Sequence, residues 1–340
     1  MYKRQLLRLA GRLFGAASEV RNLLYDTGVL AARVAPIPVV SIGGITVGGS
    51  GKTPIAADLA RRLTDAGVAT AVITHGYADE LRVHERLCPA ATVLGGRDRA
   101  SLVTRAADQG AKIAVLDSGF QHRKLRRDLD IVAVDDVSLG QPVRRLPAGP
   151  FREALSSLAR ADLILLVRRS RSVPADSPKV EDRTIAERMD RLRGLSTSLP
   201  QIIPVRIRTG DLVPANEAAI PHASPRPRVA VAGIMWPEPF FSELRRRPEG
   251  SEIELQIALS DHARIDDRFV HRLLAEDTEG GIVCTLKDVS KLAPGLGDVP
   301  LWYLEENVVW DGGVERPAPL RAALALLPSD EPTGNGVGGR

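Results

Sequence analysis

Eight residues near the start of the chain combine three glycines, a lysine and two threonines in one short turn. Their sequence is Thr46-Val47-Gly48-Gly49-Ser50-Gly51-Lys52-Thr53, after an apolar run at 38–42 and before a helix-like stretch at 54–63. Backbone N–H groups in such a turn can surround a phosphate, and the positive end of the following helix adds to the attraction. Lys52 would reach the β and γ oxygens of ATP, and the Thr53 hydroxyl would bind Mg²⁺. The order of strand, turn and helix argues against a glycine turn without a ligand.

An acidic residue at the end of another apolar run supplies a second part of such a site. Asp117 follows residues 113–116, and an acid at the carboxyl end of a buried strand lies on the ligand edge of a parallel sheet. Phosphoryl transfer needs a carboxylate there to hold Mg²⁺ directly or through water. An aspartate that caps a turn is the alternative. Asp135 and Asp136, after the next apolar run, are the second choice as metal ligands.

The elements that must position these residues form an α/β pattern. Expected strands lie at 39–42, 70–74, 113–116, 131–134 and 163–167, with helices at 54–66 and 100–109. Short buried strands separated by helices predict a P-loop NTPase-type, mostly parallel sheet flanked by helices. A second, smaller α/β unit is expected from residue 229 onward, after a stretch rich in Ala, Pro and His.

The expected organisation has four parts, which 340 residues are enough to build. They are an amphipathic, membrane-proximal helical segment at 1–35, a nucleotide-binding domain at 36–214, a smaller C-terminal α/β domain at 215–328 and a disordered tail at 329–340. The tail is assigned from its Gly-, Pro- and polar-rich composition.

The composition is that of an ordinary globular protein, with 44% hydrophobic and 26% charged residues. The net charge is only +4, but the sequence pI is about 9.2, which suits phosphate-rich or anionic-lipid partners without requiring nucleic acid. Aromatic residues make up 4% of the chain, which argues against single-strand binding by base stacking. Cys88 and Cys284 lack metal-ligand spacing, so we interpret them as reduced, buried thiols.

The N-terminal segment is amphipathic rather than membrane-spanning. Leu6, Leu9 and Leu13 recur at helical spacing, and basic residues such as Arg8 and Arg12 lie beside them. No run of apolar residues approaches the length that spans a bilayer, and the segment lacks the pattern of a signal peptide. Residues 3–17 therefore predict either a helix in the interface of an anionic membrane or a helix packed on its own domain.

Several motifs in a fixed order resemble the tetraacyldisaccharide 4'-kinase family over about residues 21–304. The matching segments are Arg21-Asn22-Leu23-Leu24-Tyr25, the loop 46–54, Gly119-Phe120-Gln121-His122, Leu146-Pro147-Ala148-Gly149-Pro150-Phe151-Arg152-Glu153, Ala232-Gly233-Ile234, Asp261-His262 and Thr285-Leu286-Lys287-Asp288. The strict phosphate-loop pattern has glycine where this chain has Thr46, but this family uses threonine there. Gly48 and Gly49 can supply the permissive backbone.

The resemblance implies a two-domain P-loop kinase with a hinge, at the cytoplasmic face of the bacterial inner membrane. Its reaction is transfer of the γ-phosphate of ATP to the 4'-hydroxyl of an acylated disaccharide 1-phosphate in lipid A biosynthesis. Carried over by motif, Asp79 and His262 form the dyad that activates this hydroxyl, although a histidine such as His262, taken alone, is more typical of an exposed loop or a cap. Because an acylated substrate must be reached from the bilayer surface, the amphipathic residues 3–17 then favour contact with the membrane. Candidate contacts to anionic substrate groups are Arg144, Arg145 and Arg152.

The chain departs from the family at three positions near the expected site. Ser118 stands where a second acid usually follows Asp117, and Leu286 stands where an acid is usual. The motif at 74–77 reads Thr-His-Gly-Tyr, and the loop that usually separates it from the Asp79-Glu80 pair is almost absent. Two alternatives therefore stay open: a catalytically impaired nucleotide-binding regulatory or interaction protein, and a P-loop kinase of another amphiphilic sugar.

Overall fold

The computed structural model describes residues 2–139, 142–169, 187–190, 192–194, 199–220, 225–261, 263–276, 278, 280–310 and 316–328. Its strands are β1 (Val39–Gly44), β2 (Thr70–Thr74), β3 (Thr92–Gly95), β4 (Ile113–Asp117), β5 (Leu129–Asp135), β6 (Leu163–Arg169), β7 (Gln201–Pro214), β8 (Val229–Ala232), β9 (Leu255–Ala258), β10 (Ile282–Cys284) and β11 (Leu301–Trp310). Its α-helices are α1 (Tyr2–Asp26), α2 (Lys52–Asp65), α3 (Ala78–Leu87), α4 (Arg99–Asp108), α5 (Asp136–Leu139), α7 (Glu238–Arg245), α8 (Asp267–Leu274), α9 (Leu286–Leu292) and α10 (Ala318–Leu324). Short 3₁₀ helices are η1 (Leu155–Arg160), η2 (Glu217–Ala219), η3 (Pro248–Gly250) and η4 (Ala293–Gly295).

The strands form one 11-stranded sheet in the order β3-β2-β4-β1-β5-β6-β7-β11-β10-β8-β9. From β3 to β7 every neighbouring pair is parallel. Every residue of β1, β2 and β4 is buried, because helices cover both faces. The predicted P-loop-type parallel sheet flanked by helices is therefore confirmed.

Two apolar layers enclose this first half of the sheet. On one face, α2 and α10 pack over β1, β4 and β5. On the other face, α4 covers β1, β2 and β4, and η1 covers β5 and β6. Because successive side chains of a strand point to opposite faces, Val39 joins one layer and Val40 the other.

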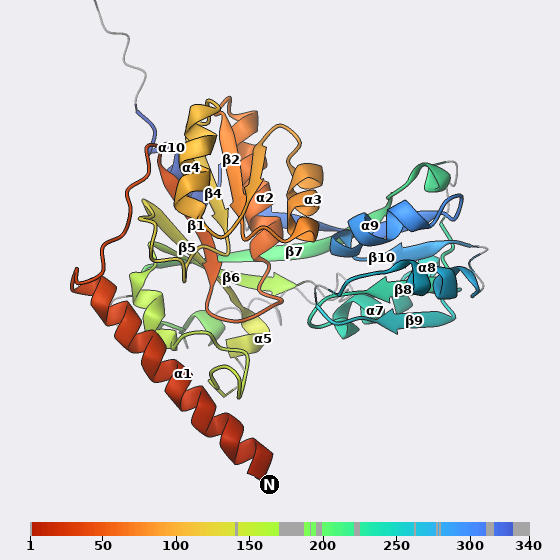
Figure 1. The fold of residues 1–340 in the computed structure, drawn as a ribbon, viewed down its shortest axis with the longest axis horizontal. Helices are drawn as coiled ribbons and strands as arrows, with labels where there is room; N and C mark the ends of the chain where they lie inside the picture. The colour runs from red at the N-terminus through yellow and green to blue at the C-terminus, as the bar shows by residue number, and fades with distance from the viewer. Residues whose placement is uncertain are drawn as a thin grey trace, which may run out of the picture.

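The second α/β unit is present but is not a separate sheet. Strands β11, β10, β8 and β9 run parallel to one another, and β11 pairs antiparallel with β7. Figure 1 shows this unit, with α7, α8 and α9, as a lobe beside the first half of the sheet. The 14-residue strand β7 pairs with β6 along 201–207 and with β11 along 205–214, so a two-stranded ribbon links the two halves.

The end of the chain returns to the first half of the molecule. Trp310 Nε1, at the end of β11, donates a 2.8 Å hydrogen bond to Asp58 Oδ2 on α2. Leu320 and Ala323 of α10 are buried in the same apolar layer as α2. The last stretch of the expected domain at 215–328 thus differs from the prediction, because its apolar residues cover the first half of the sheet.

Helix α1 extends beyond the amphipathic pattern noted at 3–17, ends within the helical segment expected at 1–35, and lies largely apart from the body (Figure 1). One side packs against the body, where added side chains at Gly11 and Gly15 would collide with Arg145. Its carboxyl end is fixed by Asn22, whose Nδ2 donates to Glu153 Oε2 at 2.9 Å. In the part of the chain that the structure describes, no helix is long and apolar enough to cross a membrane.

Candidate active site

Three predicted parts of the site meet at one edge of the sheet. The phosphate loop follows β1, Asp117 ends β4, and the segment that leads to Asp79 follows β2. Strand β4 lies between β2 and β1, and all three are parallel. The carboxyl ends of parallel strands share an edge, so the topology brings these segments together.

The phosphate loop has the conformation that its glycines permit. Gly48, Gly49 and Gly51 all have positive φ, and at Gly51 a Cβ atom would also collide with Ile207. Other residue types would be strained in this backbone. The loop begins with a buried Thr46, which bridges to Phe151, and Val47 N donates to Pro150 O at 2.8 Å. Two predicted family motifs, the loop and the segment at 146–153, are therefore in direct contact.

Positive side chains from several segments converge on Lys52. Its Nζ is 2.8 Å from Ser50 Oγ. Burial lowers the pKa of Lys52 to about 8, which Asp117 opposes and the charges of Arg152, Lys287 and Arg169 reinforce. Mutual repulsion among these cations would be relieved by a polyanion, so the site suits a chain of phosphates.

Thr53 and Asp117 form the oxygen pair expected of a magnesium site. Thr53 Oγ1 donates to Asp117 Oδ2 at 2.8 Å, at the first turn of α2. A hydroxyl and a carboxylate are the hard oxygen donors that Mg²⁺ prefers, and nucleotide phosphates usually complete its coordination. Within the described residues, no group of three His, Cys, Asp or Glu side chains could hold a metal. The hydroxyl and carboxylate of this pair fit a metal whose remaining ligands come from a nucleotide.

Asp117 also contacts a residue that the sequence did not indicate. His84 Nε2 lies 3.0 Å from Asp117 Oδ2, and both side chains are buried. Burial alone would raise the pKa of Asp117, but the hydrogen bond and charge of His84, with Thr53 and Lys52, bring it down to about 2. Burial alone would lower the pKa of His84, yet its hydrogen bond to Asp117 and the neighbouring Cys88 raise it to about 9.

Asp79 is buried at the beginning of α3, where it meets the second half of the molecule. Its Oδ2 lies 3.0 Å from Lys291 Nζ on α9. Its expected dyad partner, His262, lies outside the described residues. The preceding residue, Asp261, accepts a 3.1 Å hydrogen bond at Oδ1 from Lys287 Nζ, also on α9. The dyad therefore stays a prediction.

A loop of the second half lies over the phosphate loop. A Cβ atom at Gly48 would come within 3.0 Å of Met235 Sδ, and one at Gly49 within 3.6 Å of Trp236. This loop is anchored where Gly233 N donates to Asp288 Oδ2 at 2.8 Å. Asp288 belongs to the predicted motif at 285–288, so that motif places one end of the loop.

The second-choice metal ligands have other partners. Asp135 Oδ2 accepts from Ser138 Oγ at 3.1 Å, and Asp136 lies 3.9 Å from Arg168 Nε. Because Asp117 contacts Thr53, we favour Asp117 over Asp135 and Asp136 as the metal ligand.

The candidate substrate arginines have different surroundings. Arg152 lies near Lys52, and burial lowers its pKa. Arg145 pairs instead with Glu19 of α1, and Arg144 is exposed. Of these arginines, Arg152 is the one whose charge reaches the phosphate loop.

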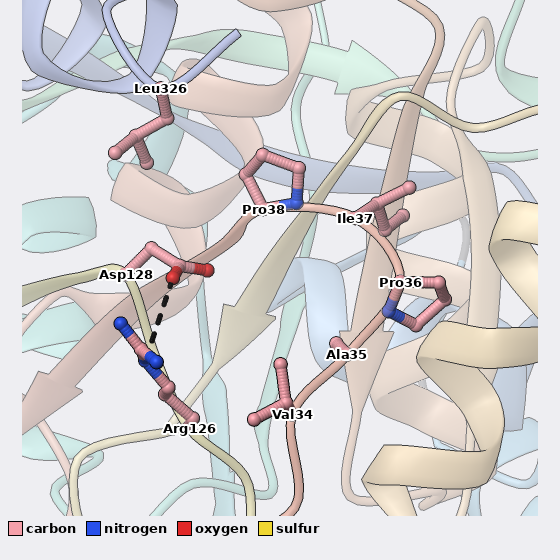
Figure 2. Close-up of a pocket in the computed structure, with 8 residues that line it drawn as sticks. All are labelled: Val34, Ala35, Pro36, Ile37, Pro38, Arg126, Asp128 and Leu326. Carbon is pink, nitrogen blue, oxygen red and sulfur yellow. Dashed lines mark ion pairs between the residues drawn. The ribbon is translucent and has the colours of Figure 1, made fainter.

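A shallow pocket of about 250 Å³ lies at the opposite edge of the sheet (Figure 2). It is lined by residues 34–38, which precede β1, together with Arg126, Asp128 and Leu326. Asp128 precedes β5, so this pocket faces the amino ends of the strands. Ligands of open α/β sheets bind at the carboxyl ends, and the pocket is therefore separate from the candidate active site.

Comparisons with known proteins agree on one family. The model of the family described as tetraacyldisaccharide-1-P 4'-kinase matches residues 3–93 and 79–318. The tetraacyldisaccharide 4'-kinase of Anaeromyxobacter dehalogenans (strain 2CP-C) is 34% identical over 322 residues, which cover 85% of this chain and 82% of that protein. The chain belongs to the tetraacyldisaccharide-1-P 4'-kinase family. The resemblance inferred from its motifs is thereby confirmed.

Other members of the tetraacyldisaccharide-1-P 4'-kinase family extend the match to nearly the whole chain. The tetraacyldisaccharide 4'-kinase of Chlorobium phaeovibrioides is 32% identical and covers 90% of this chain and 92% of its own. The crystal structure of LpxK from Aquifex aeolicus in complex with ATP has a TM-score of 0.71 at 23% identity. That match covers 96% of this chain and 99% of the other. It supports the fold described above.

The family motifs form one connected polar network behind the phosphate loop. Gln121 Nε2 donates to Gly44 O at 2.9 Å and to Glu153 Oε1 at 3.0 Å. Glu153 also binds Asn22 of α1 and pairs with Arg160. These motifs of the tetraacyldisaccharide-1-P 4'-kinase family therefore connect α1 to the end of β1.

Sequence reasoning missed four polar residues of the site. They are His84, Lys291, Arg169, whose Nε donates to Gly49 O at 3.1 Å, and Arg99, whose Nη1 donates to Ser118 O at 3.0 Å. Ser118 has a φ of 60°, the one positive value among the described non-glycine residues. A possible signal was available for Lys291, which follows the motif at 285–288 by one helical turn. No comparable signal marked His84.

Proposed function

We propose that this protein is a tetraacyldisaccharide 4'-kinase that transfers the γ-phosphoryl group of ATP to the 4'-hydroxyl of an acylated disaccharide 1-phosphate. The observation that carries the proposal is the contact between Thr53 and Asp117 beside a glycine-rich phosphate loop, in a chain of this family. In the reaction, the bond between the γ-phosphorus and the β–γ bridging oxygen breaks and a bond to the sugar oxygen forms. ADP leaves with the electrons of the broken bond.

The phosphate loop and its surrounding cations would bind and orient ATP. The N–H groups of the loop and the amino end of α2 attract phosphate oxygens, and Lys52 adds a full positive charge. Arg152, Lys287 and Arg169 contribute further charge from both halves of the molecule. Phosphoryl transfer depends mainly on positioning and charge neutralisation, so these residues would supply most of the rate enhancement.

Thr53 and Asp117 would hold Mg²⁺ through the hydroxyl and a carboxylate oxygen. When bound, Mg²⁺ neutralises charge that develops on the phosphate oxygens. Asp79, with His262 as its partner, would take the proton of the 4'-hydroxyl as the new bond forms. Such base catalysis contributes about 10²–10⁴-fold to the rate.

Helix α1 would bring the enzyme to the membrane surface where its acylated substrate lies. Its outward side exposes a series of apolar residues with high accessibility, namely Leu6 (69%), Leu9 (55%), Leu13 (65%), Val20 (57%) and Leu23 (59%). Exposed leucines beside Arg8 and Arg12 suit the interface of an anionic bilayer. We therefore assign the protein to the cytoplasmic face of the inner membrane as a peripheral enzyme.

The kinase is tested by transfer of labelled γ-phosphate from ATP to tetraacyldisaccharide 1-phosphate in detergent micelles. Lys52→Ala should lower the rate by at least about 10²-fold, the usual effect of losing one charge-stabilising group. Asp79→Asn and His262→Ala should each lower kcat by about 10²–10⁴-fold while ATP binding is retained. Lys112→Ala, an exposed lysine at the opposite edge of the sheet, is the matched control.

The outcomes separate the alternatives that the sequence left open. If phosphate transfer to the disaccharide does not exceed the Lys52→Ala background, the proposed kinase activity is overturned. ATP binding without any transfer would indicate an impaired regulatory protein. A large gain in the rate of Ser118→Asp would locate such a defect at the metal. Transfer to another lipid-extract component, with none to the disaccharide, would indicate a different amphiphilic substrate.

A further inference from the structure

His84 is a buried polar side chain with no role in the proposed phosphoryl transfer. Its ring is fully buried on α3, and its Nε2 is 3.0 Å from Asp117 Oδ2. Because a carboxylate can only accept, this contact is a hydrogen bond when Nε2 carries the proton. Buried polar groups without such partners are costly, so this contact accounts for the placement of the ring.

The contact falls on the oxygen that also receives the Thr53 hydroxyl. Thr53 Oγ1 and His84 Nε2 approach Asp117 Oδ2 at 2.8 and 3.0 Å. The other carboxylate oxygen, Oδ1, accepts from Ser118 Oγ at 3.2 Å. Three donors from three segments of the chain therefore hold one carboxylate. Of the three, His84 comes from the element that also carries Asp79.

Packing alone does not explain a histidine at this position. The second ring nitrogen, Nδ1, is buried and has no hydrogen-bond partner among the residues that the structure describes. Leaving such a buried group without a partner is destabilising. An apolar side chain of similar size would avoid that cost. The position therefore retains a ring nitrogen without a partner, and the benefit of a histidine here comes from Nε2.

We propose that His84 is a positioning residue, whose Nε2–H fixes the Asp117 carboxylate beside the Thr53 hydroxyl so that the pair is preorganised for the metal–nucleotide complex. The inference rests on the proposed function, because it takes Thr53 and Asp117 as the residues that hold Mg²⁺. It needs only a proton on Nε2, which a neutral ring and a charged ring can both present. Partners that orient metal-binding groups typically change metal affinity or activity about 10–100-fold when removed.

The test compares His84→Leu with His84→Gln. Leucine fills a similar volume without a donor, whereas glutamine can place an N–H near the position of Nε2. Binding of a non-hydrolysable ATP analogue is measured by calorimetry, once with Mg²⁺ and once with a metal chelator. Val83→Ala, which also alters a buried residue of α3, controls for general loosening of the helix. Thermal unfolding of each variant shows that it is folded.

We expect His84→Leu to fold but to be less stable than the wild type, because the buried Asp117 carboxylate loses a donor. It should bind the Mg²⁺–analogue complex about 10–100-fold more weakly. Its affinity for the metal-free analogue should change by less than about twofold, because the phosphate loop is intact. His84→Gln should recover most of the lost affinity, and Val83→Ala should keep the wild-type ratio of the two affinities.

Several results would overturn the inference. If His84→Leu binds the Mg²⁺ complex as tightly as the wild type, the ring merely fills space. If His84→Leu loses affinity for the analogue equally with and without Mg²⁺, the role of the ring is structural. The role is also structural if His84→Leu fails to fold and His84→Gln lacks the Mg²⁺-dependent affinity. If the wild type transfers phosphate but His84→Leu is unaffected, the inference alone fails. If the wild type binds no nucleotide, the proposed function fails with it.

Discussion

At the scale of single residues, Lys52 carries a charge that its surroundings disfavour. Burial and three neighbouring cations lower its pKa, and only Asp117 among its strong influences favours the charged form. A lysine whose pKa is lower in the folded than in the unfolded state reduces stability at low pH. This cost disappears as the pH rises from about 8 towards the ordinary value of 10.5. Bound phosphates would offset this cost, so the charged Lys52 lowers the stability of the free protein and raises its affinity for ATP.

This predicts that ATP affinity depends on pH on the alkaline side. The ammonium attracts phosphate and the neutral amine does not, so affinity should be about tenfold weaker at pH 9 than at pH 7. The dissociation constant, measured by calorimetry across this range, checks the prediction. Lys52→Met should bind weakly with a nearly flat profile. An equally steep loss in that variant would show that another group titrates.

The local motif predicted Lys52, Thr53 and Asp117, because a phosphate loop and a strand-end acid are recognisable within a few residues. His84 could not be predicted, since its contact with Asp117 joins residues 33 apart in sequence. That contact requires β2, which leads into α3, to lie next to β4. Only the order of strands in the sheet determines this.

At the scale of elements, the strongly apolar strands were predictable and the short mixed elements were not. Strands β1, β4 and β6 are buried on both faces, so their sequences are continuous apolar runs. Strand β3 has four half-buried residues, and α3 has a polar composition, so neither leaves a clear pattern. The helix that carries Asp79 was therefore missed although Asp79 itself was named.

Helix α1 behaves as an element of its own, which leads to a prediction about the membrane. Leu9→Asp combined with Leu13→Asp should weaken binding to vesicles with anionic lipid at least about tenfold, because a buried leucine contributes about 1.5–3 kcal/mol. Cosedimentation with the vesicles measures this. Ile220→Asp, which changes an equally exposed apolar residue elsewhere, is the control.

ATP binding should be unchanged in the α1 double variant, since its leucines are remote from the phosphate loop in the chain and exposed to solvent. If vesicle binding persists, or if Ile220→Asp weakens it equally, α1 does not make the contact.

At the scale of the whole molecule, two groups of contacts tie the halves together around the candidate site. The ribbon of β7 and β11 forms the covalent connection, and α3 contacts α9 beside it. Arg86 of α3 also donates to Pro214 O at 3.1 Å and lies over the ring of Tyr303. The sequence indicated two α/β units but not this ribbon, because pairing of strands about 90 residues apart has no local signal.

The ion pair between Asp79 and Lys291 should measurably couple the two halves. Asp79→Asn, Lys291→Met and the double variant form a thermodynamic cycle, and contacting residues typically give coupling energies of about 0.5–3 kcal/mol. Urea unfolding of the four proteins measures it. Lys291→Arg should retain most of the stability, because it keeps the charge. Strictly additive effects of the two substitutions would show that the pair does not hold the halves together.

The return of Trp310 and α10 to α2 has a consequence for how the protein is made. During synthesis, the whole phosphate-loop half emerges from the ribosome well before the residues that cover α2. The nascent chain must therefore carry an uncovered apolar face while the second half is still being translated. A protein that ends after Pro300 should reproduce this state, bind a hydrophobic dye and be cleaved by proteases within α2, whereas the full chain should resist both.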